Sequence, residues 1–460
     1  MQHLKSCFSR LLLALVLLIL LASVAAPASA ASLTVGTSGQ FKTIAEAVNA
    51  AHPGDTIMVD PGNYAENIVI DKPLTIQSQG SGSTVTAADP SKDVLQLQGA
   101  GIHIEGLTLV GASGAAGVHV NHATGCTVAG VTAHDNARAV YLDGASNCEV
   151  RDSNLANNGY GAYCDGASHN IISGNVATGE RGAGKALGDG KALGDGIYIF
   201  NGNGNTVTHN DLSANHIFGI SLFRSPDNTI SSNTIRSNEQ IGVRLFESDN
   251  NILTFNTISG NGQPGKELDF PPAAPSFGQL GIALIANGNQ IYLNNFVNQS
   301  IPMTNAQAAI LDSSQKMAYT YNNAPQTGQM GNYYSDYKGS DANGDGIGMT
   351  ASIYGDKYPL VRPFEDYGTI SVAGAATALP FQTSTGQNER TTSIFGTQNI
   401  RGILLPVLET WDTVIGFLLA PFPFILLGGV LPLGFETWGA ITVLLAAFVL
   451  LGVVIKKYYL

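Results

Sequence analysis

Charged side chains are scarce in this sequence, and basic ones are the scarcest. Only 12% of the 460 residues are Asp, Glu, Lys or Arg, and 22 basic residues stand against 34 acidic ones, for a net charge of −12. Nucleic acid is not the expected partner, because phosphate binding needs a basic face. The low charge and the 54 glycines argue against a helical bundle and favour a turn-rich β architecture.

Cysteine is also rare, and one of the four lies in an N-terminal targeting segment. This segment has a basic start at Lys5 and Arg10, an apolar run over 11–26, and the small residues 28–30. These features are typical of a secretory signal peptide, which we expect at 1–30. The three cysteines that remain exclude a dense disulfide framework in the exported chain.

Long apolar runs return only at the C-terminal end. Residues 438–455 carry no charge and precede Lys456 and Lys457, and as a helix they reach about 27 Å, enough to cross a bilayer. We expect a membrane anchor at 401–460 with one transmembrane helix at 438–455 and an additional apolar segment at 414–434; a two-span hairpin is the alternative. The lysines favour a cytoplasmic end. The chain is thus predicted to be exported and anchored in the cytoplasmic membrane, at the cell surface or on the periplasmic face, with the Thr-, Ser-, Gly- and Ala-rich residues 368–400 as a linker.

Between these ends, a short β-type segment recurs with a period of 22–23 residues. Its occurrences begin at residues 117, 139, 161, 196, 219, 242 and 281, so two intervals carry insertions. Several short strands per repeat indicate a parallel β-helix, in which each repeat is one coil and neighbouring coils lie about 4.8 Å apart. We predict an all-β domain of this kind over 31–367.

The register of the repeat separates inward from outward positions. Two apolar ladders face inward, and one of them includes Cys164 as a packing residue. Asparagine recurs at two other positions, where stacked amides are expected to hydrogen-bond along the stack. Cys126 and Cys148 fill the first two rungs of one asparagine ladder, either as a disulfide or as two stacked thiols.

The outward positions of the same strands carry the candidate site. His119, Tyr141, Tyr163, Tyr198 and Arg244 fall in one column, and Asp143 and Asp165 lie beside the tyrosines. Aromatic rings pack on sugar rings and carboxylates bond to hydroxyls, so this column predicts a surface that binds a polysaccharide or glycan. Two carboxylates one coil apart also approach the spacing of a retaining glycosidase pair, which leaves Asp143 and Asp165 open as catalytic residues. The alternative is that the aromatic ladder only stabilises the coils.

An acidic loop follows the last clear coil. Residues 339–349, GSDANGDGIGM, place Asp341, Asn343 and Asp345 at the first, third and fifth positions of an EF-hand loop, but Met349 and Ser352 occupy later ligand positions. The three side chains are candidate calcium ligands, or they bond to the loop's own amides. From its place in the register, we expect the loop, within residues 339–356, to help close the β-helix as a C-terminal cap.

Both ends of the predicted domain resemble a known family. The run TIAEAVNAAHPGDTIMVDPGNYAENIVIDKPLTI, in which a short helix would cap the first coil, resembles the start of right-handed parallel β-helix proteins, and GNYYSDYKGSDANGDGIGMTASIYGDKYPLVRPF is similar to the closing motif of the NosD-like family. The resemblance implies a right-handed β-helix and copper or carbohydrate binding. The sequence itself supports copper poorly, because its histidines are scattered, and Met349 stands where the family often has Asp.

Three functions therefore remain as expectations. The first is a membrane-anchored module that binds polysaccharide or surface glycan. The second is a carbohydrate-active hydrolase or lyase that uses the paired carboxylates. The third is a maturation factor for a copper or other metal centre, implied only by the resemblance to the NosD-like family. No cofactor is expected with certainty.

Overall fold

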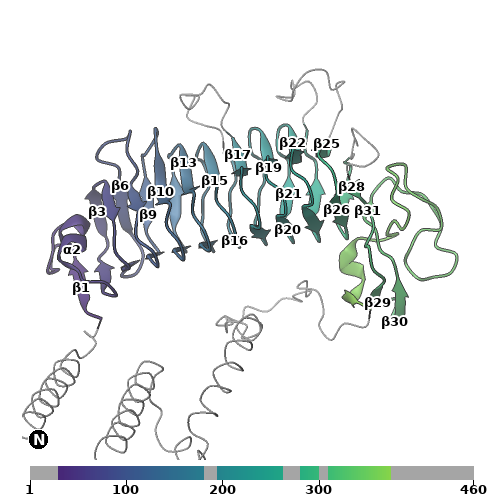
Figure 1. Ribbon diagram of the computed structural model, residues 1–460, viewed down its shortest axis with the longest axis horizontal. Helices are drawn as coiled ribbons and strands as arrows, with labels where there is room; N and C mark the ends of the chain where they lie inside the picture. The colour runs from purple at the N-terminus through teal and green to yellow at the C-terminus, as the bar shows by residue number, and fades with distance from the viewer. Residues whose placement is uncertain (1–29, 181–193, 263–279, 300–308, 374–460) are drawn as a thin grey trace, which may run out of the picture. The chain divides into compact units, whose positions relative to one another are not determined.

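The computed structural model describes residues 30–180, 194–262, 280–299 and 309–373, and Figure 1 shows them as a stack of parallel coils. The predicted all-β solenoid is confirmed for these residues. None of the helices in them is long and apolar enough to cross a membrane. The predicted signal peptide, both insertions after 180 and 262, and the anchor at 401–460 lie essentially outside the described residues.

The coils have three faces, and each face is formed by parallel strands. The back sheet joins one short strand from each coil in chain order. Its strands are β1 (Ser32–Val35), β2 (Thr56–Val59), β5 (Thr75–Ser78), β8 (His103–Glu105), β11 (Thr127–Ala129), β14 (Glu149–Arg151), β16 (Ile171–Ser173), β18 (Thr206–Thr208), β20 (Thr229–Ser231), β23 (Ile252–Thr254), β26 (Asn289–Tyr292) and β28 (Ala309–Ile310).

The front sheet contains the longer strands that the repeat predicted. Its strands are β4 (Ile68–Ile70), β7 (Leu95–Leu97), β10 (Ala116–Asn121), β13 (Arg138–Asp143), β15 (Tyr160–Asp165), β17 (Asp195–Phe200), β19 (Phe218–Phe223), β22 (Ile241–Phe246) and β25 (Leu280–Ile285). The two predicted inward ladders are buried throughout, and Cys164 packs in one of them as expected.

The side face consists of two shorter sheets connected by single bridges through Asn154, Val176 and Asp211. The first sheet contains β3 (Gly62–Ala65), β6 (Ser83–Thr86), β9 (Thr108–Val110) and β12 (Thr132–His134), and the second contains β21 (Thr234–Arg236), β24 (Thr257–Ser259), β27 (Asn295–Val297) and β31 (Tyr333–Tyr334).

The N-terminal end is closed by helix α2 (Ile44–Ala50), at the purple end of Figure 1. Thr43 and Glu46 form a capping box, and the Glu66 carboxylate accepts bonds from two amides of the first turn. Ile44, Ala47 and Val48 join the main core. The predicted helical cap is thus confirmed, although one strand, β1, comes before it and pairs with β2.

The C-terminal end has a different cap. Strands β29 (Met317–Tyr321), β30 (Ala324–Gly328) and β32 (Gly368–Val372) form an antiparallel sheet, and a short 3-10 helix, η1 (Phe364–Asp366), precedes β32. A second hydrophobic cluster, separate from the coil core, holds this cap together. Because β32 begins where the linker was predicted to begin, the folded region continues through residue 372.

Asparagine ladders run along all three corners of the coils. Two were predicted, and in each the backbone N–H of one rung donates to the side-chain oxygen of the next or, from Cys126, to the sulfur of Cys148. The first contains Cys126, Cys148, Asn170, Asn205, Asn228, Asn251 and Asn289. The second contains Ser153, Asn175, Asn210, Asn233, Asn256, Asn294 and Asn332. Cys126 and Cys148 are buried free thiols in this structure.

The third ladder was missed by sequence reasoning. It contains Asn136, Asn158, Glu180, Asn215, Asn238, Asn261 and Gln299. Glu180 is fully buried in this ladder, and burial raises the pKa of its carboxyl well above the usual value. One of its oxygens accepts from the Asn158 N–H, whereas Oε1 has no hydrogen-bond partner in the described part of the chain.

The second ladder ends in the C-terminal cap at Asp356. Its carboxylate accepts from the backbone N–H groups of Asn332 and Tyr358, and it is fully buried. Burial raises the pKa of Asp356 to about 7. The role of Asp356 in the structure is to terminate the ladder.

Candidate functional site

The outward surface of the front sheet, here called the front face, has the side-chain register that the sequence predicted. Strand pairing aligns a middle column of His119, Tyr141, Tyr163, Tyr198, Ser221 and Arg244, and a last column of Asn121, Asp143, Asp165, Phe200, Phe223 and Phe246. Each predicted ligand-binding or catalytic residue on this sheet therefore lies on one face, and one coil, that of Ser221, separates Arg244 from the others.

The exposure of the tyrosines differs from the expectation. Tyr141 is half-buried, but Tyr163 and Tyr198 are only 8% and 5% exposed. Their ring centroids lie 5.1 Å apart, and Tyr160 packs against both at 5.1 and 5.8 Å. Aromatic neighbours on the same face thus cover most of Tyr163 and Tyr198, and the assignment of the three tyrosines as ligand-binding residues stays a prediction.

Those neighbours belong to a first column that sequence reasoning did not identify. It contains Arg138, Tyr160, Asp195, Phe218 and Ile241. A glycine follows each of the last four, and it interrupts the strict alternation of the strand. A Cβ on Gly219 would lie 2.5 Å from Ile235 and 2.8 Å from the Asn238 amide, so this position faces inward against the third ladder and the residue before it turns outward.

A polar cluster lies at the N-terminal part of the front face. His119 Nδ1 is 2.8 Å from an Asp93 carboxylate oxygen, whose partner oxygen accepts from the Ala116 N–H. On the other side of the ring, Nε2 is 3.5 Å from Asp143 Oδ2, an ion-pair separation without hydrogen-bond geometry, so Nε2 is buried without a hydrogen-bond partner. The His119 side chain is 12% exposed and that of Asp143 is 30% exposed.

Tyr141 connects this cluster to a cation. The His119 ring stacks on the Tyr141 ring at 4.5 Å and 21°, and the Arg138 guanidinium carbon lies 4.6 Å from the same ring and 5.0 Å from that of Tyr163. Cation–π attraction therefore holds Arg138 in place, and its Nε is buried without a hydrogen-bond partner. Burial raises the pKa of Tyr141 to about 12, and the charges of Asp143 and Asp165 add to this.

The C-terminal part of the front face is aromatic. Phe223 and Phe246 stack at 4.9 Å with an interplanar angle of 9°. Arg244 donates from Nε to Ser221 at 2.9 Å and lies 4.6 Å from the Phe218 ring. This predicted ligand-binding arginine is thus already hydrogen-bonded, whereas Arg138 at the other end has no such bond at Nε.

The acidic loop packs against the C-terminal cap, as predicted from its position. Asp341 accepts bonds from the N–H groups of residues 344, 345 and 346, and Asp345 accepts from the Ile347 N–H and the Asn343 side-chain amide. These bonds agree with the alternative to calcium binding, in which the polar side chains of the loop hydrogen-bond to the loop's own amides. In the described residues, no group of three His, Cys, Asp or Glu is placed to hold a metal; calcium binding stays a prediction.

Gly346 shows why this loop needs glycine. Its φ of +87° is unfavourable for other residues, and a Cβ there would lie 2.6 Å from Tyr367 and 2.8 Å from Tyr321. The next residue, Ile347, forms a bridge with Leu360, which also bridges to Tyr333 on the side sheet. The loop therefore connects the cap to the last coil.

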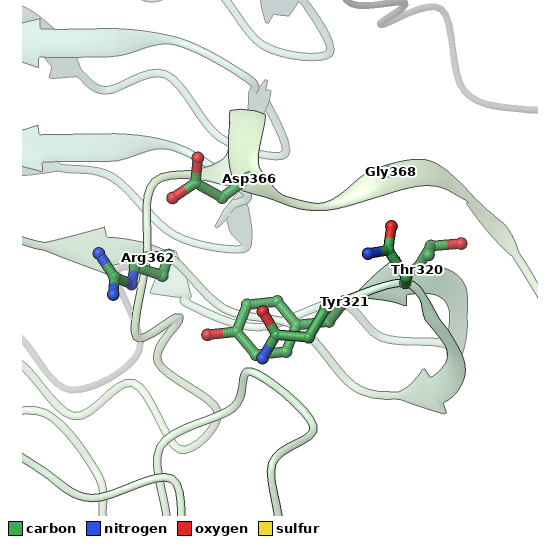
Figure 2. A pocket seen from close by; sticks show the side chains of 7 residues that line it. Thr320, Tyr321, Arg362, Asp366 and Gly368 are labelled. Atoms are coloured by element: carbon green, nitrogen blue, oxygen red, sulfur yellow. The ribbon is translucent and has the colours of Figure 1, made fainter.

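The C-terminal cap also contains an open polar cavity of about 440 Å³, shown in Figure 2. It is lined by Thr320, Tyr321, Asn322, Asn323, Arg362, Asp366 and Gly368. Tyr321 is buried and stacks on Tyr367 at 4.9 Å, while the other lining side chains are half-buried or exposed. None of these residues was predicted as a site residue, and the cavity is separate from the front face.

Comparison with known proteins agrees with the fold. The family described as "Right handed beta helix region" matches residues 116–297. A cell surface glycoprotein from Methanothermus fervidus is 35% identical over 117 residues, which are 25% of this chain and 19% of the relative. The chain thus matches about a fifth of the length of that relative.

Solved structures are similar at a lower level. An alginate lyase from Paenibacillus sp. str. FPU-7 is 18% identical, with 61% of this chain and 97% of that chain covered and a TM-score of 0.43. DFA-IIIase from Arthrobacter chlorophenolicus A6, without its lid, is 16% identical, with 59% and 82% covered and a TM-score of 0.47. These likenesses carry no inference about activity.

The resemblance to the NosD-like family stays a prediction, since the family match is to the broader β-helix region. The match spans β10 to β27, the part of the stack that carries the front-face columns. Together with the coil geometry of the described residues, it identifies residues 116–297 as a right-handed β-helix region.

Proposed function

We propose that the front face binds a polysaccharide or a surface glycan. The observation that carries this proposal is the gathering there of aromatic rings and hydrogen-bonding groups, with the half-buried Tyr141 beside Asp143 and Asp165. An aromatic ring packs on the apolar face of a sugar, and carboxylates accept bonds from its hydroxyls. The name of the relative, a cell surface glycoprotein, supports a location where glycans are present.

We further infer that the protein is exported and held at the outer side of the membrane. The support is the sequence itself: the signal-like residues 1–30 and the uncharged residues 438–455 followed by two lysines. In this arrangement the linker would hold the β-helix outside the membrane, where the front face could meet polysaccharide. Protease treatment of intact cells tests this, because a β-helix on the inner side would be protected.

Glycan-array binding by the purified full-length protein tests the proposed function. The variant Tyr141→Ala removes the one tyrosine of the middle column that is not buried, and Ile171→Ala is the matched control, because Ile171 is exposed on the back sheet of the neighbouring coil. We expect wild type and the control to bind the same glycans and Tyr141→Ala to lose at least about tenfold in affinity. A wild-type protein that binds no glycan would overturn the proposal.

One observation favours an enzyme as the second candidate. Asp143 and Asp165 pair directly in register, about 4.8 Å apart along the stack, which is near the carboxylate separation of a retaining glycosidase. His119 beside Asp143 adds a group that can accept or donate a proton. Release of reducing sugar that is abolished by Asp165→Asn, with the melting temperature unchanged, would establish this activity.

A further inference from the structure

Unpartnered buried polar atoms distinguish one part of the front face. In the described residues, four buried side-chain N or O atoms have no hydrogen-bond partner, and two of them, His119 Nε2 and Arg138 Nε, adjoin Tyr141. His119 stacks on the Tyr141 ring and Arg138 lies over it. Buried polar groups are almost always hydrogen-bonded in native proteins, so two such atoms around one half-buried ring indicate a place where a ligand completes the bonds.

The surrounding contacts define which ligand groups those two atoms can bind. Asp93 binds His119 Nδ1 at 2.8 Å, so the ring is held with Nε2 on the opposite side, toward Asp143. Arg138 has no ion pair with a carboxylate of the described residues, and its guanidinium lies over the rings of Tyr141 and Tyr163. A ligand here would thus meet one cationic donor, one imidazole nitrogen and the carboxylate oxygens of Asp143.

The charge of the face selects among glycans. Around Tyr141, the carboxylates of Asp93 and Asp143 adjoin His119, Asp165 pairs with Asp143 in the next coil, and Arg138 is the guanidinium of the described residues that lies over the ring. The carboxylate groups of a uronate polymer would lie next to Asp143 and Asp165 and be repelled, whereas uncharged hydroxyls would donate to them. Arg244, at the other end, is already bonded to Ser221.

We propose that His119, Arg138, Tyr141 and Asp143 form a subsite for one uncharged sugar residue, so that the ligand is a neutral glycan and not an acidic one. This rests on the proposed function. Because His119 and Arg138 already pack on the Tyr141 ring, this tyrosine meets the sugar through its ring edge and hydroxyl. Asp143 accepts hydroxyl hydrogens, and Arg138 donates to hydroxyl or ring oxygens. His119 Nε2 completes its hydrogen bonding with a sugar hydroxyl.

Affinity electrophoresis of the full-length protein in detergent tests the subsite, with gels that contain laminarin, mannan, polygalacturonate or alginate. We expect retardation by at least one neutral polymer and by neither acidic polymer. Because the recognised groups are uncharged, retardation should persist between about 0.05 and 0.5 M salt. Retardation by the acidic polymers alone would overturn the subsite and leave the proposed function standing, while no retardation in any gel would overturn the proposed function itself.

Two variants sharpen the test. Arg138→Met keeps an unbranched side chain over Tyr141 and removes the donor, and we expect about tenfold weaker binding of the neutral polymer. The double change Asp143→Asn and Asp165→Asn keeps the shape and removes the charge, and we expect it to permit binding of polygalacturonate. If the double variant, at an unchanged melting temperature, still rejects polygalacturonate, the charge argument is wrong.

Discussion

The corner ladders and the front face use the same coil register in opposite ways. In the second ladder, each asparagine bonds to the next rung and to backbone carbonyls, so its side-chain atoms are paired inside the protein; Asn233, for example, donates to Val207, Ser231 and Asn256. On the front face, His119 Nε2 and Arg138 Nε are buried and unpaired. The comparison teaches that stacking alone does not mark a functional residue. The front face is distinguished by buried polar atoms that have no hydrogen-bond partner.

The largest effect should come from breaking a ladder. Asn233→Ala leaves the Asn210 N–H and amide without their acceptor and two carbonyls without their donor. We expect a loss of about 3–5 kcal/mol in the free energy of unfolding, measured by chemical denaturation. Asn287→Ala is the control, because Asn287 is exposed. Equal effects of the two changes would show that the ladder is not a main source of stability.

The end of the second ladder should make stability depend on pH. Burial raises the pKa of Asp356 from 3.8 to about 7. A carboxyl with a raised folded-state pKa contributes stability that is complete below pH 3.8 and is lost as pH rises through about 7, on the order of 4 kcal/mol in total. Denaturation curves between pH 4 and 8 should therefore show falling stability for wild type and a flatter profile for Asp356→Asn. Parallel profiles would contradict this assignment.

The third ladder permits a change that stabilises. Glu180 lies where the neighbouring rungs have amides, and its Oε1 is unpartnered. Glu180→Gln removes a carboxyl that burial disfavours in its charged form, so we expect a gain of about 1–2 kcal/mol at neutral pH. The reverse change, Gln299→Glu, replaces an amide that donates to the carbonyls of Asn261 and Asn298 and should destabilise. Melting temperatures that move in the same direction for both variants would refute the amide requirement.

The front face should show the smallest change in stability. Arg138→Met removes a cation–π contact and an unpartnered donor, so we expect the free energy of unfolding to change by about 1 kcal/mol or less, even though glycan binding falls. Thermal unfolding measured beside the binding assay checks this. A loss as large as that of Asn233→Ala would place Arg138 with the structural residues and remove the contrast between the two regions.

Much of this architecture was predictable because the chain repeats. The spacing of 22–23 residues predicted the coils, both inward ladders and the middle and last columns of the front face. The first column was not predictable from strict alternation. Glycines such as Gly219 face inward against the third ladder, so the residue before each of them faces outward instead of inward. The exposure of the tyrosines was also not predictable from the repeat. A strand period predicts the face on which Tyr163 lies, but it does not predict that large neighbours in the next column cover the ring.

The C-terminal cap and the ladder substitutions were harder to predict. The hairpin between β29 and β30 had a usable signal, because Asn322 and Asn323 both adopt positive φ, as that turn requires. The third ladder had the same spacing as the other two, and Glu180 and Gln299 only obscured it. The roles of Asp93 and Asp356 left no local signal, since their partners lie 26 and 24 residues away in the chain.

The rung-to-rung bonding also determines how such a protein can change in length. In all three ladders, the distance along the chain between rungs rises from 22 or 23 to 35 or 38 residues at the insertions, and the hydrogen bonds are unchanged. Each coil therefore forms the same rung-to-rung hydrogen bonds with its neighbours at any position in the stack. Duplication or deletion of one whole coil would leave every rung paired, and it would lengthen or shorten the front face by one residue in each column. The reach of the binding surface could thus evolve in steps of one coil while its chemistry stayed the same.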